Sequence, residues 1–223
     1  MSFNGCWFWW GWKVFFFTKK LYKKLLSKTK YHSVRDEHTK KLLEGIGFEN
    51  VLNTSCPTTW KLKSFKVSIP NDDSSLILSF SLSNDDLNFV QKIINQASEK
   101  YKNVYIWIQT RAEKETFVKR VKFKENVSII DQNLHSFFEV ASKNNTFYIG
   151  SRLHASIFNL YNNNPSVTIK IDQRAGGINK AFNIPIIDYS IDLDLNDIEE
   201  RIQDTINISD AKIKESKEIF INN

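Results

Sequence analysis

Hydrophobic residues along the middle of the chain form short continuous runs, and amphipathic stretches separate these runs from one another. Continuous apolar runs are typical of strands that are covered on both faces. They predict strands at residues 50–57, 74–82, 103–110, 127–131, 146–150, 166–172 and 184–188. The amphipathic stretches predict helices at residues 33–47, 85–101, 112–121, 133–144, 151–164 and 175–182, with a polar helix from residue 195 onward. This alternation predicts an α/β fold, with a Rossmann-like parallel sheet and helices on both of its faces.

The first 30 residues combine an aromatic start with a basic segment. Lys13 interrupts the apolar stretch, which is too short for a membrane-spanning helix. The positive charge follows the apolar stretch, whereas in a signal peptide it comes first. Two interpretations remain, namely an interfacial anchor followed by a basic helix, or the end of a larger apolar fold.

The chain is mildly basic, with a formal net charge of +6 and a pI of about 9.1. The excess lies almost wholly between residues 13 and 30. Nucleic-acid binding favours basic residues that are interleaved with aromatic residues along one face, so we predict no nucleic-acid partner. A basic face beside a membrane or an anionic substrate is the alternative.

The cysteines and histidines limit the chemistry of the chain. Its two cysteines, Cys6 and Cys56, form neither a disulfide framework nor a zinc-binding spacing, which fits a reducing compartment. We expect Cys56 to be a small core residue rather than a nucleophile. The four histidines are not grouped with cysteines or carboxylates at ligand spacing, so we predict no catalytic metal.

The turn "GSRLH" at residues 150–154 is the first candidate for chemistry. Ligands of an open parallel sheet bind beyond the carboxyl ends of its strands, and Gly150 ends one of the predicted strands. We expect Ser151 to cap the next helix, so that Arg152 and His154 occupy its first turn. A helix start and a guanidinium both favour an anion, and a histidine beside them can transfer a proton. The alternative is that Arg152 pairs with a surface acid and His154 packs.

A second candidate is Arg35, in the first turn of the helix predicted at residues 33–47. The neighbouring acids Asp36 and Glu37 suit the positive end of a helix, whereas an arginine is mildly unfavourable there. This position favours a ligand for Arg35. An exposed ion pair with a neighbouring acid is the more common case.

Three segments together resemble the polysaccharide pyruvyl transferase family. They are V-R-D-x-x-T at residues 34–39, C-P-T-x-W at residues 56–60 and G-S-R-L-H-A at residues 150–155, and the resemblance extends over about residues 5–190. It implies an enzyme that transfers pyruvate as a ketal from phosphoenolpyruvate to a sugar of a surface polysaccharide. It also implies a fold similar to one half of a type B glycosyltransferase.

The resemblance also assigns roles to individual residues. It implies that Arg35 and Arg152 hold the phosphate and carboxylate of phosphoenolpyruvate, that Leu153 lines the donor site and that His154 is the acid and base. It implies no cofactor besides the donor substrate. The acceptor is expected to be a sugar or a lipid-linked oligosaccharide, and the protein is expected in the cytoplasm, with a peripheral contact to the membrane as one option.

The resemblance further implies that most of the family's N-terminal half is missing. On this view residues 1–32 are a remnant of that half with a basic linker helix, residues 33–194 form the Rossmann-like domain, and residues 195–223 form a C-terminal helix. Two alternatives remain open. One is a nucleotide-sugar glycosyltransferase of similar fold. The other is a truncated, inactive remnant that binds anions or associates with a partner that supplies the missing half.

Overall fold

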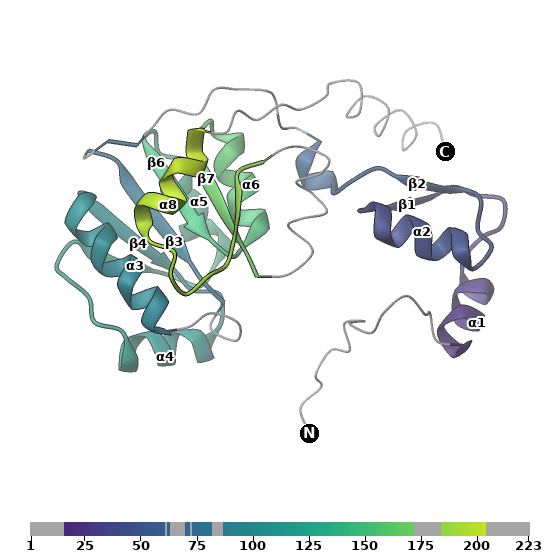
Figure 1. Cartoon of the computed structure of the whole chain (residues 1–223), viewed down its shortest axis with the longest axis horizontal. Helices are drawn as coiled ribbons and strands as arrows, with labels where there is room; N and C mark the ends of the chain where they lie inside the picture. Colours follow the sequence, from purple (N-terminus) through teal and green to yellow (C-terminus); the bar gives the residue numbers. More distant parts are fainter. Residues whose placement is uncertain are drawn as a thin grey trace.

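A six-stranded parallel sheet forms the main body of the protein (Figure 1). The computed structural model describes residues 16–60, 62, 70–71, 73–81, 87–171 and 184–203. The strands of this sheet are β3 (Ser75–Ser79), β4 (Asn103–Trp107), β5 (Val127–Ile130), β6 (Thr146–Gly150), β7 (Ser166–Lys170) and β8 (Ile186–Asp188). All neighbouring pairs are parallel. The predicted parallel α/β sheet is therefore confirmed.

The strand order is β5-β4-β3-β6-β7-β8, so the chain reverses its direction of travel across the sheet between β3 and β6. These two central strands pair along their whole length, and Ser79 at the end of β3 lies opposite Gly150 at the end of β6. In open α/β sheets, ligands bind at the carboxyl edge where the strand order reverses. The topology therefore places the turn after Gly150 at the position where this fold offers a binding site.

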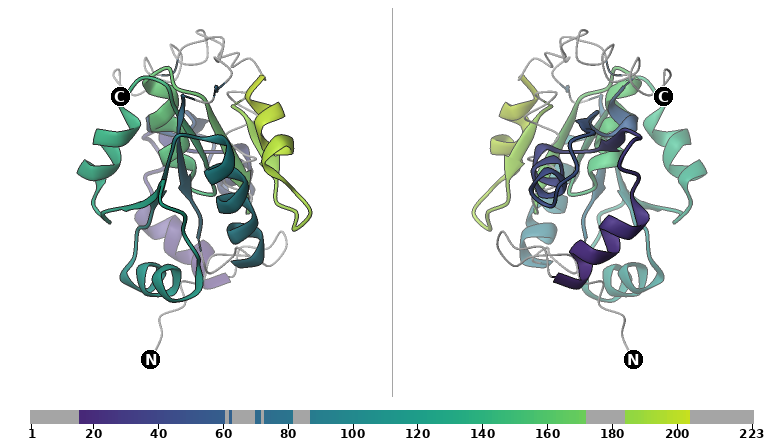
Figure 2. Two further views of the ribbon diagram at one scale, coloured as in Figure 1. Left: turned by 90° about the vertical axis from the view of Figure 1, so that its left-hand side faces the viewer. Right: turned by 90° about the vertical axis from the view of Figure 1, so that its right-hand side faces the viewer.

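Helices cover both faces of the sheet (Figure 2). On one face, Leu76 and Leu78 of β3 pack with α3 (Leu87–Lys100) and α8 (Leu195–Glu200). On the other face, Ile77 packs in one cluster with α5 (Leu134–Ala141) and α6 (Leu153–Tyr161). Successive side chains of a strand point to opposite faces, so a continuous apolar run supplies both clusters.

A second, smaller sheet precedes the main one. Strands β1 (His32–Val34) and β2 (Val51–Asn53) are parallel and are joined by α2 (Glu37–Gly45). This unit has a hydrophobic cluster of its own, formed by Val34, Leu43, Ile46, Phe48 and Val51. It lies to the right of the main sheet in Figure 1. The short 3-10 helix η1 (Pro57–Thr59) follows β2 and contacts α6, which links the two sheets.

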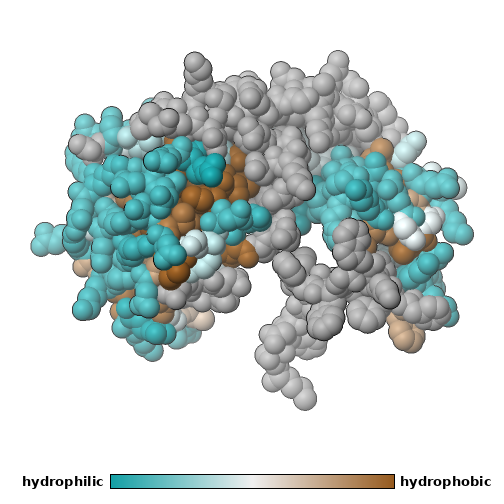
Figure 3. Space-filling model, in the orientation of Figure 1, coloured by the Kyte–Doolittle hydropathy of each residue, from teal (hydrophilic) through white to brown (hydrophobic). Residues whose placement is uncertain are grey.

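Helix α1 (Phe16–Leu25) carries the basic segment and an exposed apolar row. Phe17, Leu21 and Leu25 are spaced four residues apart, so they lie on one side of the helix, and all three are exposed. None of the described helices is long and apolar enough to cross a bilayer. Elsewhere the visible surface is mostly hydrophilic, with a hydrophobic patch on the main body (Figure 3).

The helix predicted at residues 33–47 is wrong at its start. Ser33 and Val34 belong to β1, where they pair with Leu52 and Asn53 of β2. The helix begins at Glu37, because the Asp36 side chain accepts a hydrogen bond from the backbone N–H of Thr39 and caps it there. Of the long polar helix predicted from residue 195, the structure describes α8, which ends at Glu200, and the 3-10 helix η2 (Arg201–Gln203). The aromatic start, the helix predicted at 175–182 and the stretch after residue 203 lie outside the described residues.

Candidate functional site

The end of β6 is packed so closely against β3 that its last residue must be glycine. A Cβ atom at Gly150 would lie 2.2 Å from the backbone oxygen of Ser79 and 2.8 Å from the hydroxyl of Tyr148. The next residue continues the contact, since the N–H of Ser151 donates to the same Ser79 oxygen at 2.9 Å. The two central strands are thus joined at the edge where the candidate site begins.

Helix α6 begins later than predicted, and Ser151 does not cap it. Arg152 occupies the N-cap position without a side-chain capping bond, and the first helical residue is Leu153. The Ser151 hydroxyl instead accepts a hydrogen bond from the N–H of Ser81, which follows β3. Ser151 therefore ties the turn to β3, and His154 lies in the first turn of α6 as expected.

Arg152 is held by a nearly buried carboxylate. Its Nη2 atom donates to Oε1 of Glu113, whose side chain is 10% exposed. Glu113 lies in the first turn of α4 (Arg111–Arg120), and its other oxygen accepts from the N–H groups of Gln109 and Thr110. The carboxylate thus has a fixed position, and it fixes the guanidinium. The Nε atom of Arg152 is buried without a partner among the described residues.

His154 contacts Cys56, which lies on the segment between β2 and η1. Its Nε2 atom is 3.6 Å from Sγ of Cys56, which immediately precedes η1. Burial alone would raise the pKa of the Cys56 thiol, but hydrogen bonds with His154 and Thr58 outweigh this effect and lower that pKa to about 7. Cys56 is buried, as expected of a core residue, but its contact with His154 was not anticipated.

The remaining two predicted site residues, Leu153 and Arg35, have different surroundings. Leu153 is half-buried and packs in the cluster that contains Cys56. Arg35 follows β1 rather than beginning a helix, and its Nε atom is 3.7 Å from Oδ2 of Asp36. The carbonyl of Val34, just before Arg35, accepts from the N–H of Thr54. The structure thus brings Arg152, Leu153 and His154 together with Cys56, whereas Arg35 belongs to the smaller sheet.

Sequence reasoning did not single out Glu113, although a signal for it exists. The spacing T-x-x-E at residues 110–113 is typical of a capping box, and here both of its hydrogen bonds are present. This capping box follows β4, which is separated from β6 by β3 alone. Carboxyl ends of parallel strands meet at one edge, so an acid there lies within reach of an arginine after β6.

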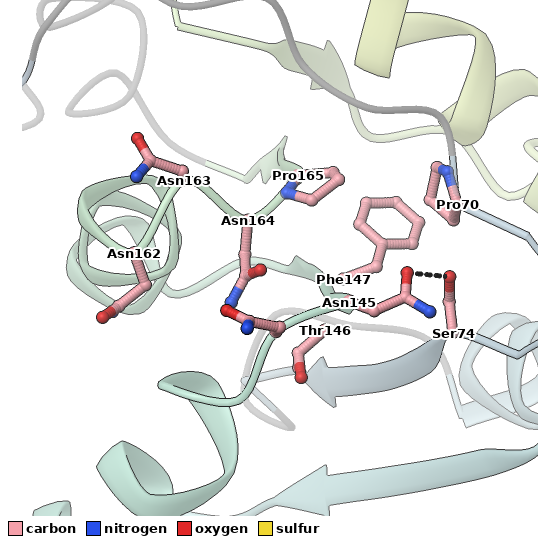
Figure 4. Close-up of a pocket in the computed structure, with 10 residues that line it drawn as sticks. Pro70, Ser74, Asn145, Thr146, Phe147, Asn162, Asn163, Asn164 and Pro165 are labelled. Atoms are coloured by element: carbon pink, nitrogen blue, oxygen red, sulfur yellow. Dashed lines mark hydrogen bonds between the residues drawn. The ribbon is translucent and has the colours of Figure 1, made fainter.

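A hollow of about 320 Å³ lies at the opposite edge of the sheet (Figure 4). It is lined by the turns at residues 144–145 and 162–164, beside Ser74 and the starts of β6 and β7. Several of its amides are already used, since Asn145 accepts from Ser74 at 2.7 Å and Asn164 donates to two backbone carbonyls. These side chains hold turns together, so this hollow is not our candidate site.

Metal ligands do not gather in the described part of the chain, where no three His, Cys, Asp or Glu side chains form a group that could hold an ion. The arrangement at the carboxyl edge offers other chemistry. A fixed guanidinium favours a carboxylate or phosphate, and an exposed imidazole above a buried thiol can give and take a proton.

The family model for polysaccharide pyruvyl transferases matches residues 15–173. The chain belongs to this family. The match includes α1, the smaller sheet and the main sheet as far as β7, and therefore every candidate site residue named above. No curated protein matches this pyruvyl transferase family member.

Solved structures of nucleotide-sugar enzymes share the fold of this pyruvyl transferase family member. S. aureus MnaA in complex with UDP matches with a TM-score of 0.53 at 10% identity, over 86% of this chain and 60% of that one. The UDP-GlcNAc 2-epimerase of Methanocaldococcus jannaschii, in complex with UDP-GlcNAc and UDP, matches with a TM-score of 0.52 at 13% identity, over 87% and 61%. The chain thus spans about three fifths of the length of these structures, and such low identities show the fold alone.

Proposed function

We propose that the chain acts as a polysaccharide pyruvyl transferase, which transfers pyruvate as a ketal from phosphoenolpyruvate to a sugar of a surface polysaccharide. The family match supports the class of reaction. The observation that carries the proposal is that Arg152 and His154 both belong to the turn from β6 into α6, at the edge where the strand order reverses. The proposal includes no cofactor, and the acceptor is a sugar or a lipid-linked oligosaccharide.

The donor is a small, highly charged molecule, and the site has matching groups. Arg152, oriented by Glu113, supplies a planar fork for the carboxylate or phosphate of phosphoenolpyruvate. Arg35 is 37% exposed and lies beside Asp36, and its guanidinium is the cation that we propose for the other anionic group. Fixed cations stabilise the charge distribution of the transition state. Such electrostatic stabilisation is the largest single contribution to the rate enhancement of many enzymes.

His154 has the central role in the chemistry. The protonated ring gives its proton to the methylene carbon of phosphoenolpyruvate, which becomes a methyl group and leaves the neighbouring carbon electrophilic. A sugar hydroxyl attacks that carbon and loses its proton to the ring. The carbon–oxygen bond to phosphate then breaks, phosphate leaves with a proton, and a second hydroxyl closes the ketal as its proton departs. One proton enters the methylene group, one leaves with phosphate, and the two hydroxyls supply both.

The test uses the full chain, phosphoenolpyruvate and a panel of sugar acceptors with two neighbouring free hydroxyls. We expect phosphate to be released only when an acceptor is present, and mass spectrometry to find one ketal for each phosphate. Release of UDP from a UDP-sugar, without consumption of phosphoenolpyruvate, would contradict the proposal and favour a nucleotide-sugar enzyme.

A further inference from the structure

The contact between Cys56 and His154 places a buried thiol beneath an exposed imidazole. The two residues are 98 positions apart, and Sγ lies 3.6 Å from Nε2. Cys56 is 6% exposed, whereas His154 is exposed. His154 makes no other hydrogen bond to the described residues, so its second ring nitrogen, Nδ1, is available to a substrate.

The segment around Cys56 is held in place by several hydrogen bonds. The carbonyl of Cys56 accepts from both the N–H and the hydroxyl of Thr59, at 2.8 and 2.6 Å. Trp60 directly follows η1, and its ring N–H donates to the carbonyl of Thr54, which precedes Cys56 by two residues, at 2.9 Å. These bonds close a tight loop between β2 and η1. They fix the backbone that carries the thiol.

The surroundings of the thiol explain why it is paired with this histidine. Cys56 shares a cluster with the buried side chains of Leu62, Ile157, Leu160 and Ile184. In such a cluster a thiolate is unfavourable unless a positive or hydrogen-bonding group faces it. The described polar groups against its sulfur are the His154 ring on α6, at 3.6 Å, and two groups of Thr58 on η1, namely its hydroxyl at 3.0 Å and its backbone N–H.

We propose that Cys56 is a positioning residue for His154, which holds the ring through Nε2 and shares a proton with it, so that Nδ1 acts on the substrate. The chemistry of this role rests on the proposed function, while the proton sharing is a property of the folded chain alone. Because the thiol and the ring are in contact, the thiol can replace the proton that the ring gives to the methylene carbon. The proton that the ring takes from the acceptor hydroxyl can pass back to the sulfur by the same contact.

The first experiment tests the proton sharing without any activity assay. Cys6→Ser leaves Cys56 as the only thiol of the full chain, and the ultraviolet absorbance of the thiolate is followed against pH. We expect the Cys56 thiol to titrate with a midpoint of about 7. When His154→Ala is added, this midpoint should shift toward or beyond the ordinary thiol pKa of 9.0. His135→Ala, on exposed α5 surface, is the matched control and leaves the midpoint unchanged. A midpoint that His154→Ala does not move would overturn the proposal.

The second experiment separates proton sharing from packing. In the phosphate-release assay, we expect kcat/KM of the unmodified chain to change with pH near 7, and both Cys56→Ala and Cys56→Ser to lose this inflection. Cys56→Ser keeps a hydrogen-bonding group and should recover part of the rate that Cys56→Ala loses. Unchanged pH profiles in both variants would overturn the role of the shared proton. Absence of phosphate release from every protein, with a thiol titration that still depends on His154, would count against the proposed function and not against the pair.

Discussion

Alanine in place of Gly150 is expected to lower the free energy of unfolding by about 3 kcal/mol or more, at the upper end of the usual cost of overpacking. The added Cβ would lie 2.2 Å from the backbone oxygen of Ser79, and backbone cannot turn away as a flexible side chain can. The strands β3 and β6 would have to separate at the end of the sheet that carries the site. Urea denaturation of the purified variant measures this cost.

Gly45 provides the matched control. It lies in α2, where a Cβ meets nothing within 4 Å. We expect Gly45→Ala to be neutral or to stabilise the chain by about 0.5–1 kcal/mol, because alanine is the better helix former. If both variants unfolded at the same urea concentration as the unmodified chain, the close approach of β3 and β6 would not be a requirement of the fold.

Replacement of His154 by glutamine is expected to lower kcat for pyruvyl transfer by about 10²–10⁴-fold, the usual contribution of a general acid or base. Glutamine keeps a hydrogen-bonding side chain at the start of α6 but carries no proton to give near neutral pH. The affinity for phosphoenolpyruvate should change little, since Arg152 and Arg35 are the proposed anion-binding groups. Phosphate release under saturating donor measures kcat.

His135→Gln is the matched control for this experiment. The His135 side chain is 84% exposed on α5 and pairs with Glu139 four residues later. Its replacement should leave kcat unchanged. A His154→Gln variant with more than a tenth of the original kcat would remove His154 from the proton transfer.

Much of the fold follows from the local pattern of the chain. The continuous apolar run of β3 predicts a strand covered on both faces, and its side chains do pack with helices on both sides. The start of α2 could not be read in the same way. Ser33 and Val34 fit either a helix or a strand locally, and their pairing with β2 decides between these.

The candidate site was predictable in its positions but not in its contacts. Arg152 and His154 could be placed because a strand that turns into a helix is visible in the sequence. Their partners could not be placed in the same way, since Glu113 is 39 and Cys56 is 98 positions away along the chain. Cys56 looks like an ordinary core residue in sequence. The docking of η1 on α6, a tertiary contact, brings it to the histidine.

The most direct test of the central claim is calorimetric titration of the folded full chain with phosphoenolpyruvate. We expect saturable binding, weakened at least about tenfold by Arg152→Ala, because a hydrogen bond to a charged group contributes roughly 1.5–3 kcal/mol. Arg152→Lys keeps the charge but loses the fork, and it should also bind more weakly. Arg111→Ala, whose side chain is 90% exposed on α4, should bind as the unmodified chain does. Binding of UDP without binding of phosphoenolpyruvate, or equal affinities of the Arg152→Ala and unmodified chains, would contradict the account.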